Sequence, residues 1–285
     1  MIKISKYFFE AIFIYSFFLV GKLIGLSLSR KIFSFIFRKI GPLIRSNDLV
    51  IKNLMNFSNE LTDDKKKEII YEMWSNYGMT FIEYVFLNNF KKGQSHINIE
   101  GENILQKISS NNKPVVFISG HFANFELMSM EITRKKINLA TIYRPLNNFF
   151  LNPFMEYIRR KYVCKNQIKK GRKGVKESVE YLKNNHSIAL MIDQRVTEGE
   201  KIKFFNKKAF TTTLPGQLAL KYNLDIVPIF IERTKNNLFE MKIYEPIKSS
   251  NFKDKSEISE KLNKIIEKMI EKNPKQWIWT HDRWK

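Results

Sequence analysis

Short apolar runs alternate with amphipathic stretches along the chain after residue 93. Brief runs rich in valine, isoleucine and aromatic residues predict strands, whereas apolar positions three and four residues apart predict helices. The expected strands cover residues 97–99, 115–119, 138–143, 188–192, 226–231 and 238–244. The expected helices cover residues 124–135, 150–163, 175–183, 214–222 and 257–272. This alternation predicts an α/β fold with a mixed, largely parallel central sheet flanked by helices. In such sheets functional residues follow the carboxyl ends of strands.

The amino-terminal part of the chain carries a different pattern. Residues 11–29 contain a single lysine, and such a stretch can cross or lie in a bilayer if the lysine reaches the interface. Farther on, Lys31, Arg38 and Arg45 recur every seven residues and share one helical face, opposite a row of phenylalanine and isoleucine. Gly41-Pro42 is expected to break or bend that helix.

Two interpretations of this part stay open. Residues 1–57 can form a membrane anchor with an interfacial helix, followed by one catalytic domain over residues 58–285. Alternatively, they can form a buried helix pair of the globular domain. The apolar composition favours the anchor. The basic residues between positions 30 and 39 would then hold the main domain on the cytoplasmic side of the membrane. The pattern does not decide whether the anchor spans the bilayer or lies flat on it.

Composition and charge narrow the class of protein. The 285 residues are 44% hydrophobic and 27% charged, which is typical of a globular chain. The single cysteine, Cys164, excludes an internal disulfide and favours a reducing compartment. A net charge of +21 attracts nucleic acid, an anionic membrane leaflet or an acidic protein. Because many of the 24 phenylalanines lie early in the chain, lipid contact is favoured over nucleic acid. No zinc-ligand spacing or glycine-rich phosphate loop is present, so neither a metal nor a cofactor is expected.

One histidine lies where an α/β enzyme places working residues. His121 follows the expected strand 115–119 on a glycine-led turn, and Glu126 comes five positions later. Five residues turn a helix by about 500°, so the two side chains cannot share one helical face. They could meet if His121 lies in the turn and Glu126 reaches back from the first helical turn. A carboxylate on one ring nitrogen would let the other take a proton from an alcohol. Spacing alone also allows a structural histidine.

Several blocks in order sharpen this hypothesis. They are 119–126 (SGHFANFE), 141–148 (TIYRPLNN), 191–195 (MIDQR), 204–205 with 209–212 (FF, AFTT) and 277–285 (WIWTHDRWK). Together they resemble the lipid A biosynthesis acyltransferases, the lauroyl and myristoyl transferases. These share a histidine-four-residues-acid motif with glycerolipid acyltransferases. The chain departs from the usual pattern at Ala123, where glycine is common, at Phe125, where tryptophan is common, and at Asp282, which is often basic.

The resemblance implies an activity and a set of site residues. A fatty acyl group would pass from acyl carrier protein to a hydroxyl of a lipid A precursor at the inner membrane, without a cofactor. His121 would be the general base and Glu126 would orient it. Arg159 and Asp193 are further catalytic candidates, with a solvated arginine and a structural ion pair as their alternatives. The residues expected to bind substrate are Arg144, Asn147, Arg195 and Arg283.

The resemblance also suggests how partners are recognised. Nine basic residues and no acidic one lie between Arg159 and Lys176. This patch would attract the carrier protein or the sugar phosphates of the acceptor, unless it is only a solvated surface. Three rival functions stay open: the same chemistry on a glycerolipid or other glycolipid, the use of acyl-CoA as donor, and a non-catalytic protein that binds anionic lipid or nucleic acid. The chain length of the acyl group and the place of the reaction in the acylation order are not determined by these residues.

Overall fold

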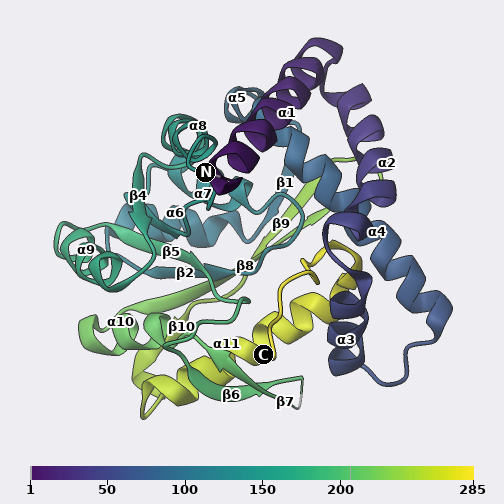
Figure 1. Ribbon diagram of the computed structural model, residues 1–285. Helices are drawn as coiled ribbons and strands as arrows, with labels where there is room; N and C mark the ends of the chain where they lie inside the picture. Colours follow the sequence, from purple (N-terminus) through teal and green to yellow (C-terminus); the bar gives the residue numbers. More distant parts are fainter. Residues whose placement is uncertain (1, 206) are drawn as a thin grey trace.

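The computed structural model describes residues 2–205 and 207–285. Its centre is an eight-stranded sheet in the order β1-β9-β8-β2-β5-β3-β4, with β10 paired to β8 (Figure 1). The strands are β1 (Ile97–Glu100), β2 (Val116–Ser119), β3 (Leu139–Tyr143), β4 (Asn166–Lys169), β5 (Ser187–Met191), β8 (Asp225–Arg233), β9 (Phe239–Ile243) and β10 (Ile247–Lys248). The strands from β8 to β4 along this order run parallel, whereas β9 and β10 run antiparallel to β8. The expected mixed, largely parallel sheet is confirmed.

Helices cover both faces of the sheet, with α6 and α7 on one side and α10 and α11 on the other (Figure 1). These helices are α6 (Glu102–Asn111), α7 (Glu126–Arg134), α8 (Asn152–Ile158), α9 (Arg172–Lys183), α10 (Leu214–Tyr222) and α11 (Lys255–Lys272). Every residue of β2 is buried, which explains its uninterrupted apolar pattern.

Several strands were not expected from the sequence. The polar edge strand β4 lies within the basic stretch, and β6 (Glu200–Phe204) forms an antiparallel hairpin with β7 (Lys207–Thr211). Each has few apolar positions, so periodicity gives no strong strand signal there. The helix expected over residues 150–163 is divided: α8 ends at Ile158 and a π-helical turn covers Arg159–Val163.

Five further helices precede β1. They are α1 (Ile2–Ile24), α2 (Leu26–Ile44), α3 (Asn47–Phe57), α4 (Asp63–Glu83) and α5 (Leu87–Lys92), with a 3₁₀ turn at Tyr84–Phe86. Gly25 separates α1 from α2 with a positive φ of 83°, a conformation that glycine adopts without steric cost. The break expected at Gly41-Pro42 is wrong, because α2 continues to Ile44. Pro42 lies in the last turn, and Gly41 lets the helix approach the indole of Trp74.

The expected boundary at residue 57 does not separate two independently packed units. The Asn53 amide on α3 donates hydrogen bonds of 2.8 Å to the carbonyls of Trp279 and His281, near the carboxyl end of the chain. Arg30 on α2 forms a buried ion pair with Glu83 on α4. Helices α2 and α3 are therefore part of the main domain's core, while α1 exposes most of its apolar side chains.

Helix α1 has the length and composition of a membrane span. Residues 3–24 have a mean hydropathy of 1.7, and 17% of the tested segment is buried. One side of α1 contacts the loop before α8: the Asn148 amide donates to the carbonyl of Tyr7 at 2.8 Å, and the Tyr15 hydroxyl donates to that of Phe150 at 2.8 Å. These contacts connect the apolar helix to the carboxyl edge of the sheet.

Candidate active site

Strand register brings His121 and Asp193 together. Strands β2 and β5 are parallel neighbours, and Ser119 pairs with Met191 at their carboxyl ends. Each side chain lies two residues beyond its member of that pair, so the two leave the sheet side by side. Gly120 allows the turn, since a Cβ there would lie 2.6 Å from the Phe122 ring. The structure thus places two of the predicted catalytic residues in direct contact.

The carboxylate of Asp193 is held from three directions. Its Oδ1 lies 2.8 Å from Nδ1 of His121, while its Oδ2 accepts from the His121 backbone N–H at 2.9 Å and from the Trp277 indole at 2.8 Å. Burial raises the pKa of this carboxyl, but the His121 charge and these hydrogen bonds outweigh burial and lower that pKa to about 2. The carboxylate is therefore ionised at neutral pH and holds Nδ1 of the imidazole in the protonated form.

The other ring nitrogen of His121 is available for chemistry. The side chain of His121 is 20% exposed, whereas that of Asp193 is 1% exposed. Nε2 makes no hydrogen bond to any residue in the described part of the chain. An imidazole with a buried carboxylate on one nitrogen and a free second nitrogen is a suitable general base.

Glu126 has different partners from those expected. Its Oε1 accepts from the Tyr84 hydroxyl at 2.7 Å and from Nε of Arg159 at 2.8 Å, and Nη2 of Arg159 lies 2.6 Å away. The expected orientation of His121 by Glu126 is not what the structure shows, because Asp193 occupies that position. The reason is that Glu126 begins α7 and projects toward α4 and the π-helical turn.

Glu126 and Arg159 form an ion pair with little exposure to solvent. Burial lowers the pKa of the Arg159 guanidinium, but Glu126 and Tyr84 more than compensate and raise it. Burial and the Glu126 carboxylate raise the pKa of the Tyr84 hydroxyl far above its usual range. Arg159 therefore keeps its charge, and Tyr84 keeps its proton. Arg159 opens the π-helical turn, a feature often found at functional sites.

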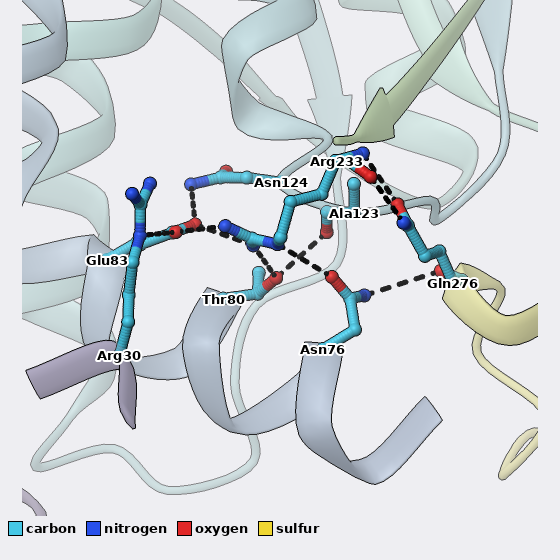
Figure 2. Close-up of polar contacts among 8 residues, drawn as sticks. All are labelled: Arg30, Asn76, Thr80, Glu83, Ala123, Asn124, Arg233 and Gln276. Carbon is cyan, nitrogen blue, oxygen red and sulfur yellow. Dashed lines mark hydrogen bonds and ion pairs between the residues drawn. The ribbon is translucent and has the colours of Figure 1, made fainter. Parts of the chain in front are cut away.

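A second buried network supports the turn that carries His121 (Figure 2). Glu83 on α4 accepts from Arg30, from Arg233 at the end of β8 and from the Asn124 amide at 2.9 Å. Burial would raise the pKa of the Glu83 carboxyl, but Arg233 and Arg30 lower it. Asn124 lies between His121 and Glu126 in sequence, so the network anchors the turn between them.

The backbone of the same turn is held at Ala123. Ala123 has a positive φ of 43°, which an L-residue adopts only when its surroundings require it. Its carbonyl accepts from the Thr80 hydroxyl at 3.0 Å, and its N–H donates to the carbonyl of Gln276 at 3.2 Å. The conformation also explains why glycine would suit this position.

The residues expected to bind substrate fall in two environments. Arg144 and Asn147 are exposed on the loop after β3, on the same sheet edge as His121. Arg195 is partly buried, and its backbone N–H donates to Nε2 of His281 at 2.9 Å. Arg283 is fully buried and donates to the carbonyl of Phe210 and the hydroxyl of Thr211. Its contacts attach the carboxyl-terminal segment to β7, so a direct substrate contact is not supported.

Three residues around the site were not singled out from the sequence. Glu83 ends the long helix α4, and Tyr84 begins the 3₁₀ turn after it. The periodicity there indicates only packing, and nothing in the local pattern marks either residue. Trp277 belongs to a block that resembles the family, but its bond to Asp193 spans 84 positions.

The site points to a class of protein before any comparison: a histidine held by a buried carboxylate, with its second ring nitrogen free, is an arrangement typical of enzymes that use a general base. The model for bacterial lipid A biosynthesis acyltransferases matches residues 2–285. Lipid A biosynthesis acyltransferase 2 of Shigella flexneri is 20% identical over 97% of this chain and 91% of its own length. The lipid A biosynthesis palmitoleoyltransferase of Escherichia coli K12 is 23% identical over 85% of this chain and 79% of its own length. The chain therefore belongs to the bacterial lipid A biosynthesis acyltransferase family and is an acyltransferase.

Another relative and one solved structure complete the comparison. The lipid A biosynthesis lauroyltransferase of Escherichia coli K12 is 21% identical over 85% of this chain and 79% of its own length. A crystal structure of the 1-acyl-sn-glycerophosphate acyltransferase of Thermotoga maritima covers 89% of this chain and 100% of its own, with a TM-score of 0.43 at 13% identity.

Proposed function

We propose that this acyltransferase moves a fatty acyl group from acyl carrier protein to a hydroxyl of a lipid A precursor, with His121 as general base. The observation that carries the mechanism is the 2.8 Å contact between Nδ1 of His121 and Asp193. It leaves Nε2 as the basic nitrogen, facing the partly exposed side of the site. Family membership supports the lipid A precursor as the acceptor.

The reaction follows from the two ring nitrogens. Nε2 takes the proton of the acceptor hydroxyl while its oxygen attacks the thioester carbonyl carbon. The tetrahedral intermediate then collapses: the carbon–sulfur bond breaks, the ester forms, and the thiolate takes the proton back from Nε2. Asp193 stabilises the imidazolium between these steps. A positioned base of this kind contributes roughly 10²- to 10⁴-fold to the rate.

Glu126 and Arg159 act together in this proposal. Arg159 uses Nε and Nη2 for Glu126, so its Nη1 is not needed for that ion pair. We propose that Arg159 stabilises the negative charge that develops on the thioester oxygen, while Glu126 and Tyr84 hold the guanidinium in place. A hydrogen-bond donor that the protein already holds in place need not reorganise as the transition state forms. Glu126 is thus a positioning residue.

The enzyme is proposed to act at the cytoplasmic leaflet of the inner membrane. Support comes from the exposed apolar side chains of α1 and from the basic residues of α2. The basic stretch from Arg159 to Lys176 includes β4, and its last four basic residues follow the carboxyl end of that strand, where they are suited to an acidic carrier protein. The loop with Arg144 and Asn147 is placed to contact the acceptor.

Acyl transfer by detergent-solubilised protein tests the proposal. The donors are acyl carrier protein thioesters and the matching CoA thioesters, and the acceptor is a lipid A precursor. His121→Ala should lower kcat roughly 10²- to 10⁴-fold. His186→Ala is the matched control, because His186 is half-buried, lies at the amino end of β5 and hydrogen-bonds through its ring to the nearby Asn184 carbonyl. Undiminished transfer by folded His121→Ala would contradict the mechanism. Faster transfer from the CoA thioester would identify acyl-CoA as the donor. Transfer to a glycerolipid but not to the lipid A precursor would identify a glycerolipid as the acceptor.

A further inference from the structure

A second hollow lies beside the active site, between α2, α4, the end of β8 and the segment before Trp277. Its volume is about 610 Å³, within the range of small-molecule binding sites. The lining residues that carry a positive charge are Arg30, Lys31, Arg38, Arg233, Lys235 and Lys275. Glu72 is the lining acid among the residues that the structure describes.

The positive and negative charges around this hollow, which we call the basic pocket, do not cancel one another. Glu83 and Glu68 do not line the pocket, but they form ion pairs with cations that do. Glu83 pairs with Arg30 and Arg233, and Glu68 pairs with Lys275. Counting these two carboxylates with Glu72 against six cations leaves an excess of three positive charges. An excess of this size in a concave site attracts an anion with more than one negative charge.

Three residues that line the pocket have a buried donor without a partner among the residues described. Arg30 is 8% exposed, and its Nη2 bonds to no other residue in the described ranges. Figure 2 shows its terminal nitrogens pointing away from the Glu83 carboxylate that holds Nε. Nε of Arg38 and the hydroxyl of Thr234 are likewise buried without a partner among the residues described. Burial and the neighbouring charge of Arg233 lower the pKa of the Arg30 guanidinium, a cost that a bound anion would relieve.

We propose that the basic pocket binds a phosphomonoester of the glycolipid acceptor. This inference rests on the proposed function, because it assigns a binding site to that acceptor. A phosphomonoester carries about −1.5 to −2 at neutral pH and offers three strong acceptor oxygens. The positive excess and the unpartnered guanidinium match this ligand better than a phosphodiester, which carries one charge.

The pocket is placed for a ligand whose chains lie in a membrane. Lys31, Ser34 and Arg38 line it from one face of α2. Ile32 and Phe35, each one position farther along, are exposed on the neighbouring face, about 100° around the helix. A headgroup in the pocket would therefore have its acyl chains beside an apolar surface.

A single layer of residues connects the pocket to the catalytic turn. Asn76 and Gln276 line the pocket, and the carbonyl of Gln276 accepts from the Ala123 N–H. The next residue, Trp277, donates to Asp193. A phosphate in the pocket would thus hold the acceptor against the segment that positions His121. We expect its loss to weaken acceptor binding rather than the chemical step.

Direct binding tests the site without any catalysis. The probe is glucosamine 1-phosphate, with glucosamine as the counterpart that lacks the phosphate, and binding is measured by titration calorimetry on the full chain. Lys31→Ala and Lys235→Ala should each weaken phosphate-dependent binding roughly tenfold, the loss of one charge-assisted hydrogen bond. Both lysines are exposed, so these variants are expected to fold.

Lys39→Ala is the matched control, since Lys39 is exposed on the same helix but does not line the pocket. Unchanged binding in Lys39→Ala, with weakened binding in the other two, supports the site. Equal losses in all three variants would overturn it in favour of a diffuse basic surface. Equal binding of phosphorylated and unphosphorylated sugar would also overturn it. Competition by phosphatidylglycerol nanodiscs as strong as that by the phosphorylated acceptor would assign the pocket to a membrane phospholipid instead.

Kinetics separate this inference from the proposed function. With the phosphorylated acceptor, Lys31→Ala should raise KM roughly tenfold and leave kcat unchanged. With the dephosphorylated acceptor, the wild type and the variant should have equal KM values. Acyl transfer with the same KM for both acceptors in the wild type would overturn the pocket and leave the proposed function standing. Phosphate binding without acyl transfer would support the pocket and contradict the proposed function.

Discussion

Two buried carboxylates at the same edge of the sheet have opposite tasks. Asp193 pairs with the imidazole of His121, which is 20% exposed and has a second ring nitrogen without a partner among the residues described. Glu83 pairs with Arg30 and Arg233, whose guanidinium groups donate hydrogen bonds and do not serve as bases. The first pair can therefore move a proton, whereas the second can only hold structure. The chemistry of the partner, rather than the burial of the acid, is what suits Asp193 to the proposed proton transfer and Glu83 to a structural role.

The two regions are also connected. Ala123 and Asn124 lie two and three positions after His121 and are bonded to Thr80 and Glu83, respectively, so the structural network fixes the backbone of the turn that carries His121. This connection predicts that damage to the Asp193 region changes rate with modest loss of stability. Damage to the Glu83 region should change stability first.

Asp193→Asn should have the largest effect on activity. An amide cannot stabilise the imidazolium or accept all three hydrogen bonds that Asp193 receives, so kcat should fall roughly 10²- to 10⁴-fold. The measurement is acyl transfer beside thermal unfolding, with the exposed Asp64→Asn as control. A variant that keeps more than a tenth of the wild-type kcat would exclude Asp193 as the partner of the base.

Glu83→Gln should have the largest effect on stability. It leaves two buried arginines with a neutral partner, and removing one member of a buried ion pair costs about 3–5 kcal/mol of unfolding free energy. Urea unfolding in detergent measures this cost. Activity per folded molecule should change less than in Asp193→Asn. A stability loss below about 1 kcal/mol would show that the network does not hold the fold.

Thr80→Val tests the link between the regions. It removes the hydroxyl that donates to the Ala123 carbonyl and leaves that buried oxygen unpaired, at a cost of about 1–3 kcal/mol. Thr80→Ser retains the donor and should recover most of the loss. If Thr80→Val and Thr80→Ser unfold at the same urea concentration, the hydrogen bond is not what stabilises the turn.

The smallest expected effect is a pH dependence from His281. Burial lowers the pKa of this imidazole to about 4, compared with 6.5 for an unperturbed histidine. The unfolded chain therefore binds the proton first, and stability falls as the pH drops from 6.5 to 4. His281→Gln should make this slope shallower, by less than about 1.4 kcal/mol per pH unit because the ring retains solvent contact. Parallel slopes for both proteins between pH 7 and 4 would contradict the assignment.

Local patterns were sufficient for most of the sheet and for part of the site. The runs around β2, β5 and β8 are buried strands, and their apolar residues mark them without any tertiary information. His121 could be selected because it follows such a strand, whereas Asp193 was selected from the resemblance to the acyltransferase family. The hairpin of β6 and β7 and the edge strand β4 were missed, since polar strands with one exposed face resemble loops in sequence.

The partners of the acids could not be found the same way. Glu126 was paired with His121 because they are five residues apart, yet its partners Tyr84 and Arg159 lie 42 and 33 positions away. The helix orientation that produces this choice depends on how α7 packs against α4. The continuation of α2 past Pro42 could not be found from the local pattern either, because Gly41 packs against Trp74, which lies on a different helix, α4.

The sequence by itself determined the strand–helix alternation, the positive charge, the apolar amino-terminal helix and the identity of the histidine. These depend on composition and on neighbours within a few positions. The tertiary structure decided which acid holds His121, which arginines enclose Glu83 and where an uncompensated positive charge forms a pocket. Each of those depends on strand register and helix packing, which join residues more than 30 positions apart.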